Sequence, residues 1–114
     1  MLRELLALPE VTEICELRSS FGIMAFHGGN LERCTDVIAS ELATRTGSSL
    51  YAVVQQPPLR QHVPSTAFDP DHSPVLRSFI DHVDIVIAIH GYGREDRFWD
   101  CLLYTSPSPR DRSL

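Results

Sequence analysis

Two histidines and one glutamate in this sequence have the types and positions of a metal-binding set. His27 and His90 each follow an apolar run and precede a glycine, and Glu32 comes shortly after His27. Two imidazoles and one carboxylate are a known zinc set, in which the fourth position is left to water or substrate. Zinc in such a site lowers the pKa of its bound water to about 7 and polarises a carbonyl group. The three residues therefore predict a catalytic zinc site.

Each of these residues also has a simpler interpretation. A single histidine after a strand is more often a loop or capping residue, and a glutamate in a first helical turn ordinarily favours the helix dipole. His27-Gly28-Gly29 is also similar to a glycine-rich oxyanion loop of some esterases, which need a Gly-x-Ser-x-Gly motif. The sequence contains no such motif, so the esterase interpretation is weakened rather than removed. Only the combination of the three residues favours a metal.

The metal set requires two neighbouring parallel strands. Residues 21–26 and 84–89 are short apolar runs bounded by turn signals, which is typical of buried central strands. In open α/β sheets, ligands bind beyond the carboxyl ends of parallel strands. Both histidines would then lie on one edge of the sheet, where the adjacent glycines let the backbone approach a bound group closely.

The other segments predict the rest of an α/β layer. Apolar residues at helical spacing predict a helix over residues 31–46, with Asn30 as N-cap, Gly47 as the C-terminal stop and Cys34 facing the sheet. We also expect an edge strand at residues 11–17, a buried strand at 49–55, a long connection at 56–74 and a short amphipathic helix at 75–83. This order predicts an open, mixed, largely parallel α/β sheet.

Length, charge and cysteine content exclude several classes of protein. The 114 residues allow one domain. We see no apolar span of about 20 residues and no secretory signal, so we expect a cytoplasmic protein without membrane contact. The net charge of −5 argues against direct nucleic-acid binding, which needs clustered lysine and arginine. Three cysteines without C-x-x-C spacing suggest free thiols in a reducing compartment.

The last residues differ in character from the rest of the chain. Residues 101–111 look like a translation of the transposase adaptor used in shotgun DNA sequencing, and they include a Ser-Pro-Ser-Pro run. We therefore expect residues 101–114 to be non-native, and residues 1–100 to be the N-terminal portion of a single domain truncated at its C-terminus. An ordinary disordered tail is the alternative. We assign no function to this segment.

Three motifs, in the same order, resemble the poly-γ-glutamate hydrolase family. Residues 27–35, His-Gly-Gly-Asn-Leu-Glu-Arg-Cys-Thr, resemble its signature HGG-x-x-E-x-x-T. Residues 59–69 resemble its histidine-containing loop, which ends in Ser-Thr, an aromatic residue and Asp, and residues 86–91 resemble its strand ending in His-Gly. The resemblance covers roughly residues 10–100. Bacterial members of this family are often labelled phage-related replication proteins.

The resemblance implies a zinc-dependent amide hydrolase that cleaves γ-glutamyl bonds. It implies a sheet similar to that of zinc carboxypeptidases, and a γ-linked glutamate polymer or another amide as substrate. The family's metal ligands correspond to His27, Glu32 and His90, the set that the spacing also predicts.

Four more residues are candidates for contact with substrate. His62, Ser65 and Thr66 belong to the family-like loop and are expected to line a substrate pocket, the alternative being a proline-bounded surface loop. Arg94 can hold a substrate carboxylate in bidentate fashion, although an arginine after a Gly-Tyr-Gly turn is more often merely solvated.

No residue is assigned as the general base. A carboxypeptidase-like mechanism needs a carboxylate from the C-terminal half, which would be absent from a truncated chain. Glu95 and Asp96 follow the second histidine, but they read better as solvated loop charges. Enzymatic activity is therefore left open, and a non-catalytic metal-binding fragment or a phage-related accessory protein are the alternatives.

Overall fold

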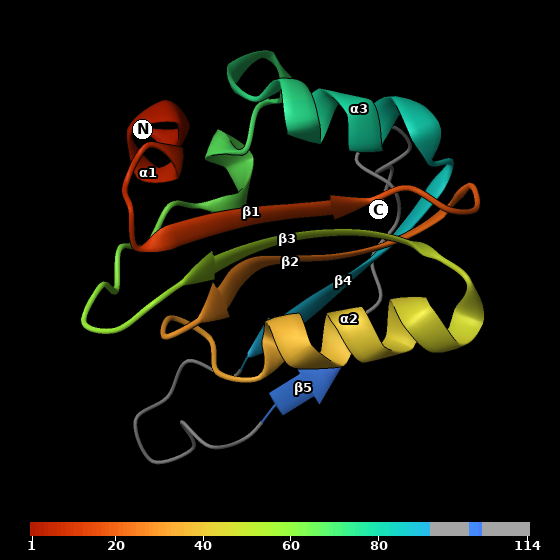
Figure 1. The fold of residues 1–114 in the computed structure, drawn as a ribbon, viewed down its shortest axis with the longest axis horizontal. Coiled ribbons are helices and arrows are strands. Elements are labelled where there is room, and N and C mark those ends of the chain that lie inside the picture. Colours follow the sequence, from red (N-terminus) through yellow and green to blue (C-terminus); the bar gives the residue numbers. More distant parts are fainter. Residues whose placement is uncertain (92–100, 104–114) are drawn as a thin grey trace.

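A mixed sheet forms the centre of the molecule (Figure 1). The computed structural model describes residues 1–91 and the backbone of residues 101–103. The strand order is β1-β3-β2-β4-β5, and the strands are β1 (Val11–Glu16), β2 (Phe21–Gly29), β3 (Ser49–Gln55), β4 (Ile85–Gly91) and β5 (Cys101–Leu103). Strand β2 is parallel to both β3 and β4, whereas β1 is antiparallel to β3 and β5 is antiparallel to β4. The predicted α/β class with a mixed sheet is confirmed.

Helices cover both faces of this sheet (Figure 1). Helix α2 (Thr35–Thr46) packs on one face, while α1 (Leu2–Leu6) and α3 (Pro74–His82) lie on the other. Successive side chains of a strand point to opposite faces, so each inner strand supplies two cores. On β3, Leu50 and Ala52 pack with the α2 face, and Tyr51 and Val53 pack with the α3 face. Within the described residues, no helix is long and apolar enough to cross a membrane.

The expected strands are present, and two of them extend further than predicted. The edge position of β1 and the inner positions of β2, β3 and β4 agree with the sequence pattern. However, β2 continues to Gly29 and β4 continues to Gly91. His27 and His90 are therefore the closing residues of strands rather than the first residues of loops. Strand β5 uses the start of the segment that we expect to be non-native, and the origin of that segment stays a prediction.

Helix α2 begins later than predicted, so the expected span of residues 31–46 is wrong at its start. The helix begins at Thr35, and its N-cap residue is Cys34, which has a φ of 60° and makes no side-chain capping bond. Asn30 does not cap the helix, because its Nδ2 atom donates a hydrogen bond to the carbonyl of Leu59 at 3.0 Å. Cys34 is exposed and does not face the sheet. The predicted end at Gly47, which has a φ of 70°, is confirmed.

A partly buried polar network joins β1, β3 and the start of α3. The Tyr51 hydroxyl donates to Glu13 Oε2 at 2.6 Å, and the Ser73 hydroxyl donates to the same oxygen at 2.6 Å. Ser73 Oγ also accepts from the N–H of Leu76 at 3.0 Å, which caps α3. Burial raises the pKa of Tyr51, and its hydrogen bond to the Glu13 carboxylate raises that pKa further.

This network predicts a loss of stability at alkaline pH. An unfolded tyrosine loses its proton above about pH 10, whereas folded Tyr51 keeps it, so the folded state binds more protons there. The free energy of unfolding should therefore fall above about pH 10, by roughly 1 kcal/mol per pH unit for this one group. Urea unfolding at several alkaline pH values should show a shallower fall for Tyr51→Phe. Equal slopes in the two proteins would contradict the prediction.

Candidate metal centre

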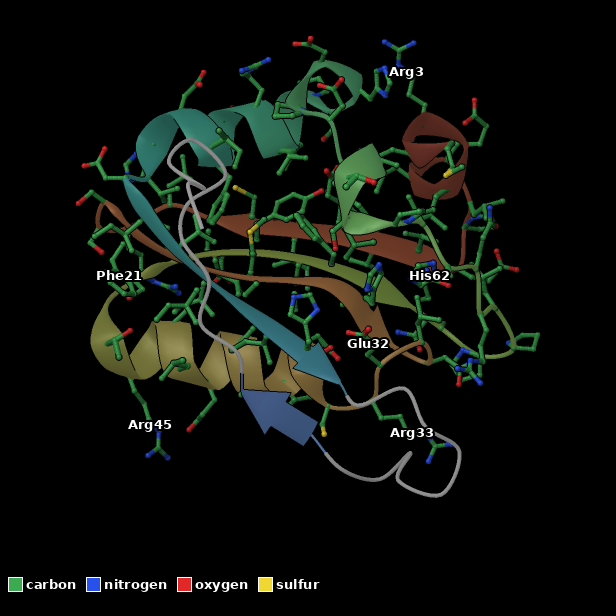
Figure 2. The ribbon with its side chains drawn as sticks, turned by 180° about the vertical axis from the view of Figure 1, so that it is seen from behind. Arg3, Phe21, Glu32, Arg33, Arg45 and His62 are labelled. Carbon is green, nitrogen blue, oxygen red and sulfur yellow. The ribbon has the colours of Figure 1, made fainter. Side chains whose placement is uncertain are left out.

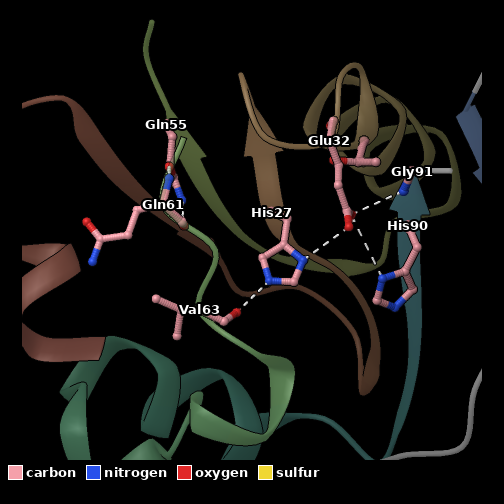
Figure 3. Close-up of polar contacts among 8 residues, drawn as sticks. His27, Glu32, Gln55, Gln61, Val63, His90 and Gly91 are labelled. Atoms are coloured by element: carbon pink, nitrogen blue, oxygen red, sulfur yellow. Dashed lines mark hydrogen bonds and ion pairs between the residues drawn. The ribbon is translucent and has the colours of Figure 1, made fainter. Parts of the chain in front are cut away.

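The parallel pairing of β2 and β4 brings the two histidines to one edge of the sheet. The strands pair from Phe21 with Ile85 to Met24 with Ala88, so both run toward the same edge. Figure 3 shows the Glu32 carboxylate between the rings of His27 and His90. The possible ligand atoms of these three residues all lie within 4.8 Å of one another. The structure thus brings the predicted set together, while its role as a set of metal ligands stays a prediction.

A tight turn after β2 places Glu32 between the strand ends. The N–H of Glu32 donates to the carbonyl of His27 at 2.8 Å, and the Thr35 hydroxyl donates to the carbonyl of Glu32 at 2.8 Å. The carboxylate then accepts a hydrogen bond from the N–H of Gly91 at 3.1 Å. A Cβ atom at position 91 would lie 2.9 Å from the Cβ of Glu32, so glycine permits this close approach. The late start of α2 is what lets Glu32 turn back.

The His27 ring has one bonded nitrogen and one open nitrogen. His27 is only 4% exposed, and its Nε2 lies 2.7 Å from the carbonyl oxygen of Val63. A carbonyl can only accept, so Nε2 carries the proton. Nδ1 has no hydrogen-bond partner among the described residues, and it lies 3.3 Å from Glu32 Oε2. A buried polar atom without a hydrogen bond is rare and needs an explanation.

A metal ion bound to Nδ1 would account for this arrangement. Histidine ligands usually donate their other ring N–H to a carbonyl or carboxylate, as His27 does to Val63. Ligands at about 2.0–2.1 Å from a tetrahedral zinc lie about 3.3 Å apart, close to the separation of His27 Nδ1 and Glu32 Oε2. His90 Nδ1 lies 3.9 Å from the other carboxylate oxygen of Glu32. The donor types therefore fit zinc, and the three donors, which lie within 4.8 Å of one another, would draw closer around a bound ion.

Electrostatics couple His27 to Glu32. Burial by itself lowers the pKa of His27, but the Glu32 carboxylate and the Val63 carbonyl outweigh it, and the net pKa is raised. Burial by itself raises the pKa of Glu32, but the adjacent His27 ring, the hydrogen bond from the N–H of Gly91 and the nearby His90 ring bring that pKa below its ordinary value. Glu32 is therefore held as a carboxylate, which is the form that binds metal.

The other predicted site residues are only partly accounted for. The His62 ring lies beside that of His27, with centroids 4.8 Å apart, and its side chain is exposed. Figure 2 shows His62 and Glu32 toward one end of the sheet and Phe21 at the opposite end. Ser65 and Thr66 are exposed in a short 3-10 turn, Ser65–Ala67.

Some predicted residues are not joined to the metal set in the structure, and one residue that contacts the set was not predicted. No hydrogen bond within residues 1–91 joins the Ser65 or Thr66 side chain to the metal set. Arg94, Glu95 and Asp96 lie outside the described residues. Sequence reasoning missed Val63, because a backbone carbonyl leaves no mark in the residue type.

Comparison with known proteins supplies the family. A family model described as Poly-gamma-glutamate hydrolase matches residues 8–100. The chain belongs to the poly-gamma-glutamate hydrolase family. No curated protein and no solved structure matches the chain. The family resemblance drawn from three motifs is thus confirmed, and the part of the chain that matches the poly-gamma-glutamate hydrolase family contains His27, Glu32 and His90.

Proposed function

We propose that this protein is a zinc-dependent amide hydrolase that cleaves γ-glutamyl bonds in a γ-linked glutamate polymer. The observation that carries the proposal is the open Nδ1 of buried His27, which lies next to Glu32 and His90. The family description adds the reaction class and the polymer. A zinc-carboxypeptidase-like architecture, with residues 1–100 as the N-terminal portion of one domain, belongs to the same proposal.

His27, Glu32 and His90 would hold the metal. Two imidazole donors favour zinc over magnesium and calcium, which prefer oxygen ligands. When bound, zinc supplies an activated water and a polarised substrate carbonyl. The chain's own contribution is orientation: Val63 keeps the proton on Nε2 of His27, and the N–H of Gly91 fixes the Glu32 carboxylate.

The loop that follows β3 is the proposed substrate contact. Every residue of a γ-linked glutamate polymer keeps a free α-carboxylate, so the substrate is a polyanion and needs hydrogen-bond donors. His62, Ser65 and Thr66 are exposed and carry such donors, and His62 lies directly beside the metal set. Arg94 is proposed as a further carboxylate ligand from its sequence position. The general base is not assigned.

The test combines metal content with bond selectivity. We expect the full-length protein, which contains the complete domain, to bind about one zinc per molecule and to release amines from γ-linked glutamate oligomers. A chelator should stop this release, added zinc should restore it, and α-linked oligomers of equal length should remain intact. Absence of bound zinc, or equal cleavage of both linkages, would contradict the proposal.

A second candidate function is metal binding without catalysis. It is favoured by the lack of an assigned general-base carboxylate among the described residues near the metal set. The same experiment separates the two functions, since this candidate predicts one bound zinc and no release of amine from either linkage.

A further inference from the structure

We propose that Gln55 is a positioning residue for the metal centre. Its side-chain amide clamps the backbone of Gln61, and the clamped segment presents the Val63 carbonyl to Nε2 of His27. The inference rests on the proposed function, because the group being positioned is the proposed metal ligand.

The clamp uses both ends of a buried amide. Gln55 is the last residue of β3 and is only 1% exposed. Its Nε2 donates to the carbonyl of Gln61 at 2.8 Å, and its Oε1 accepts from the N–H of Gln61 at 2.8 Å (Figure 3). A carboxamide offers a donor and an acceptor side by side without charge. The side chain therefore imitates one rung of a β-ladder and fixes the loop where no strand pairs with it.

A second tether holds the same segment further upstream. The side chain of Asn30 donates to the carbonyl of Leu59 at 3.0 Å, and the backbone N–H of Asn30 donates to the carbonyl of Gln55 at 2.8 Å. The segment 59–63 is thus tied to the ends of β2 and β3. The buried Val63 side chain anchors its far end in the core. Burial of the Val63 side chain does not by itself fix the direction in which the Val63 carbonyl points. The clamp on the backbone of Gln61, two residues earlier, restricts that direction.

The direction of the Val63 carbonyl decides which nitrogen of His27 is available to bind a metal ion. With the Val63 carbonyl in place, the proton sits on Nε2 and Nδ1 is open toward Glu32. Without it, the alternative is a proton on Nδ1 that donates to Glu32 and blocks the metal-binding atom. Loss of such an outer partner typically weakens metal binding by about 10–100-fold. Gln55 acts on the metal through three backbone groups and touches neither metal nor substrate.

The first test compares zinc affinity in two glutamine variants. Gln55→Met keeps the length of the side chain and removes the amide, so we expect zinc to bind about 10–100-fold more weakly. Gln61→Ala is the matched control, because residue 61 enters the clamp through its backbone only and its side chain is exposed. It should bind zinc as the wild type does. Wild-type affinity in folded Gln55→Met would overturn the proposal.

The second test is read in the metal-free protein. In ¹⁵N-labelled protein the His27 Nε2 proton should exchange slowly with water in the wild type and in Gln61→Ala. It should exchange rapidly in Gln55→Met, while the amide of Val53 on β3 stays protected. A general loss of stability would instead speed exchange at both positions. A slowly exchanging Nε2 proton in Gln55→Met would defeat the clamp.

A third variant tests the clamp in case Gln55→Met does not fold. Gln61→Pro removes one clamp bond at an exposed position without altering the core, and it should show the same loss of affinity and of proton protection. A folded Gln61→Pro protein that keeps both would overturn the proposal. If the wild type binds no zinc, the proposed function fails. The exchange rate of the His27 Nε2 proton in the metal-free protein would still show whether Gln55 positions His27.

Discussion

Replacing His27 with alanine is expected to remove zinc from the protein. The substitution deletes the most buried of the three donors and leaves only Glu32 and His90. Loss of an outer partner already costs about 10–100-fold in metal affinity or activity, so loss of a ligand should exceed this range. Elemental analysis of purified protein should fall from about one zinc per chain to nearly none, and any hydrolysis of γ-linked oligomers should disappear with it.

Two further variants make this result specific. His90→Ala should lose zinc in the same way, because it removes a donor of the same set. His72→Ala is the control, since His72 is an exposed histidine in the short turn before α3. It should keep a full complement of zinc. Unchanged metal content in both His27→Ala and His90→Ala would refute the assignment of the metal centre.

The second large effect is expected at Gly29. Gly29 and Gly47 have nearly the same left-handed backbone, with φ values of 72° and 70°. An alanine at either position suffers the same conformational strain, roughly 1–2 kcal/mol. A Cβ at position 47 meets nothing within 4 Å, but at position 29 it would lie 2.3 Å from the carbonyl oxygen of Gln55. Gly29→Ala should therefore lose about 1–3 kcal/mol more of the free energy of unfolding than Gly47→Ala.

The comparison separates strain from collision. Residue 29 pairs with Gln55 in the parallel ladder, and a backbone atom held in a ladder moves aside less easily than a side-chain tip. Urea unfolding of the two variants measures the difference directly. Similar destabilisation of the two proteins would show that the β2–β3 ladder yields at this point, contrary to the prediction.

The sequence predicts the parts of this fold that depend on local pattern. The inner strands are buried on both faces, so they appear as apolar runs, and their parallel order follows from the helices between them. The convergence of His27 and His90 follows from that order, because parallel neighbours end at the same edge. The family resemblance also comes from short motifs that can be read without a structure.

Other features depend on partners that are distant in the sequence. Asn30 is a good N-cap residue by type, but its amide is occupied by Leu59, which lies on the loop that crosses the end of the sheet. The backbone carbonyl of Val63 is invisible to any motif of side chains. A glutamine at the end of an apolar strand is a weak signal, and only the structure shows that Gln55 is buried. The contacts of Asn30 and His27 join residues 29 and 36 positions apart, so no local pattern indicates them.

The contact between Glu32 and Gly91 has a consequence for evolution and design. Strands β2 and β4 pair up to Met24 and Ala88. Beyond that level the Glu32 carboxylate lies between the two strand ends and accepts a hydrogen bond from the N–H of Gly91. The Glu32 side chain thus links the ends of β2 and β4 beyond the last backbone pair that joins them. Any substitution of Glu32 that is intended to change the chemistry of the site would also remove this link between the two strand ends. Reactivity and architecture therefore cannot be varied independently at this position.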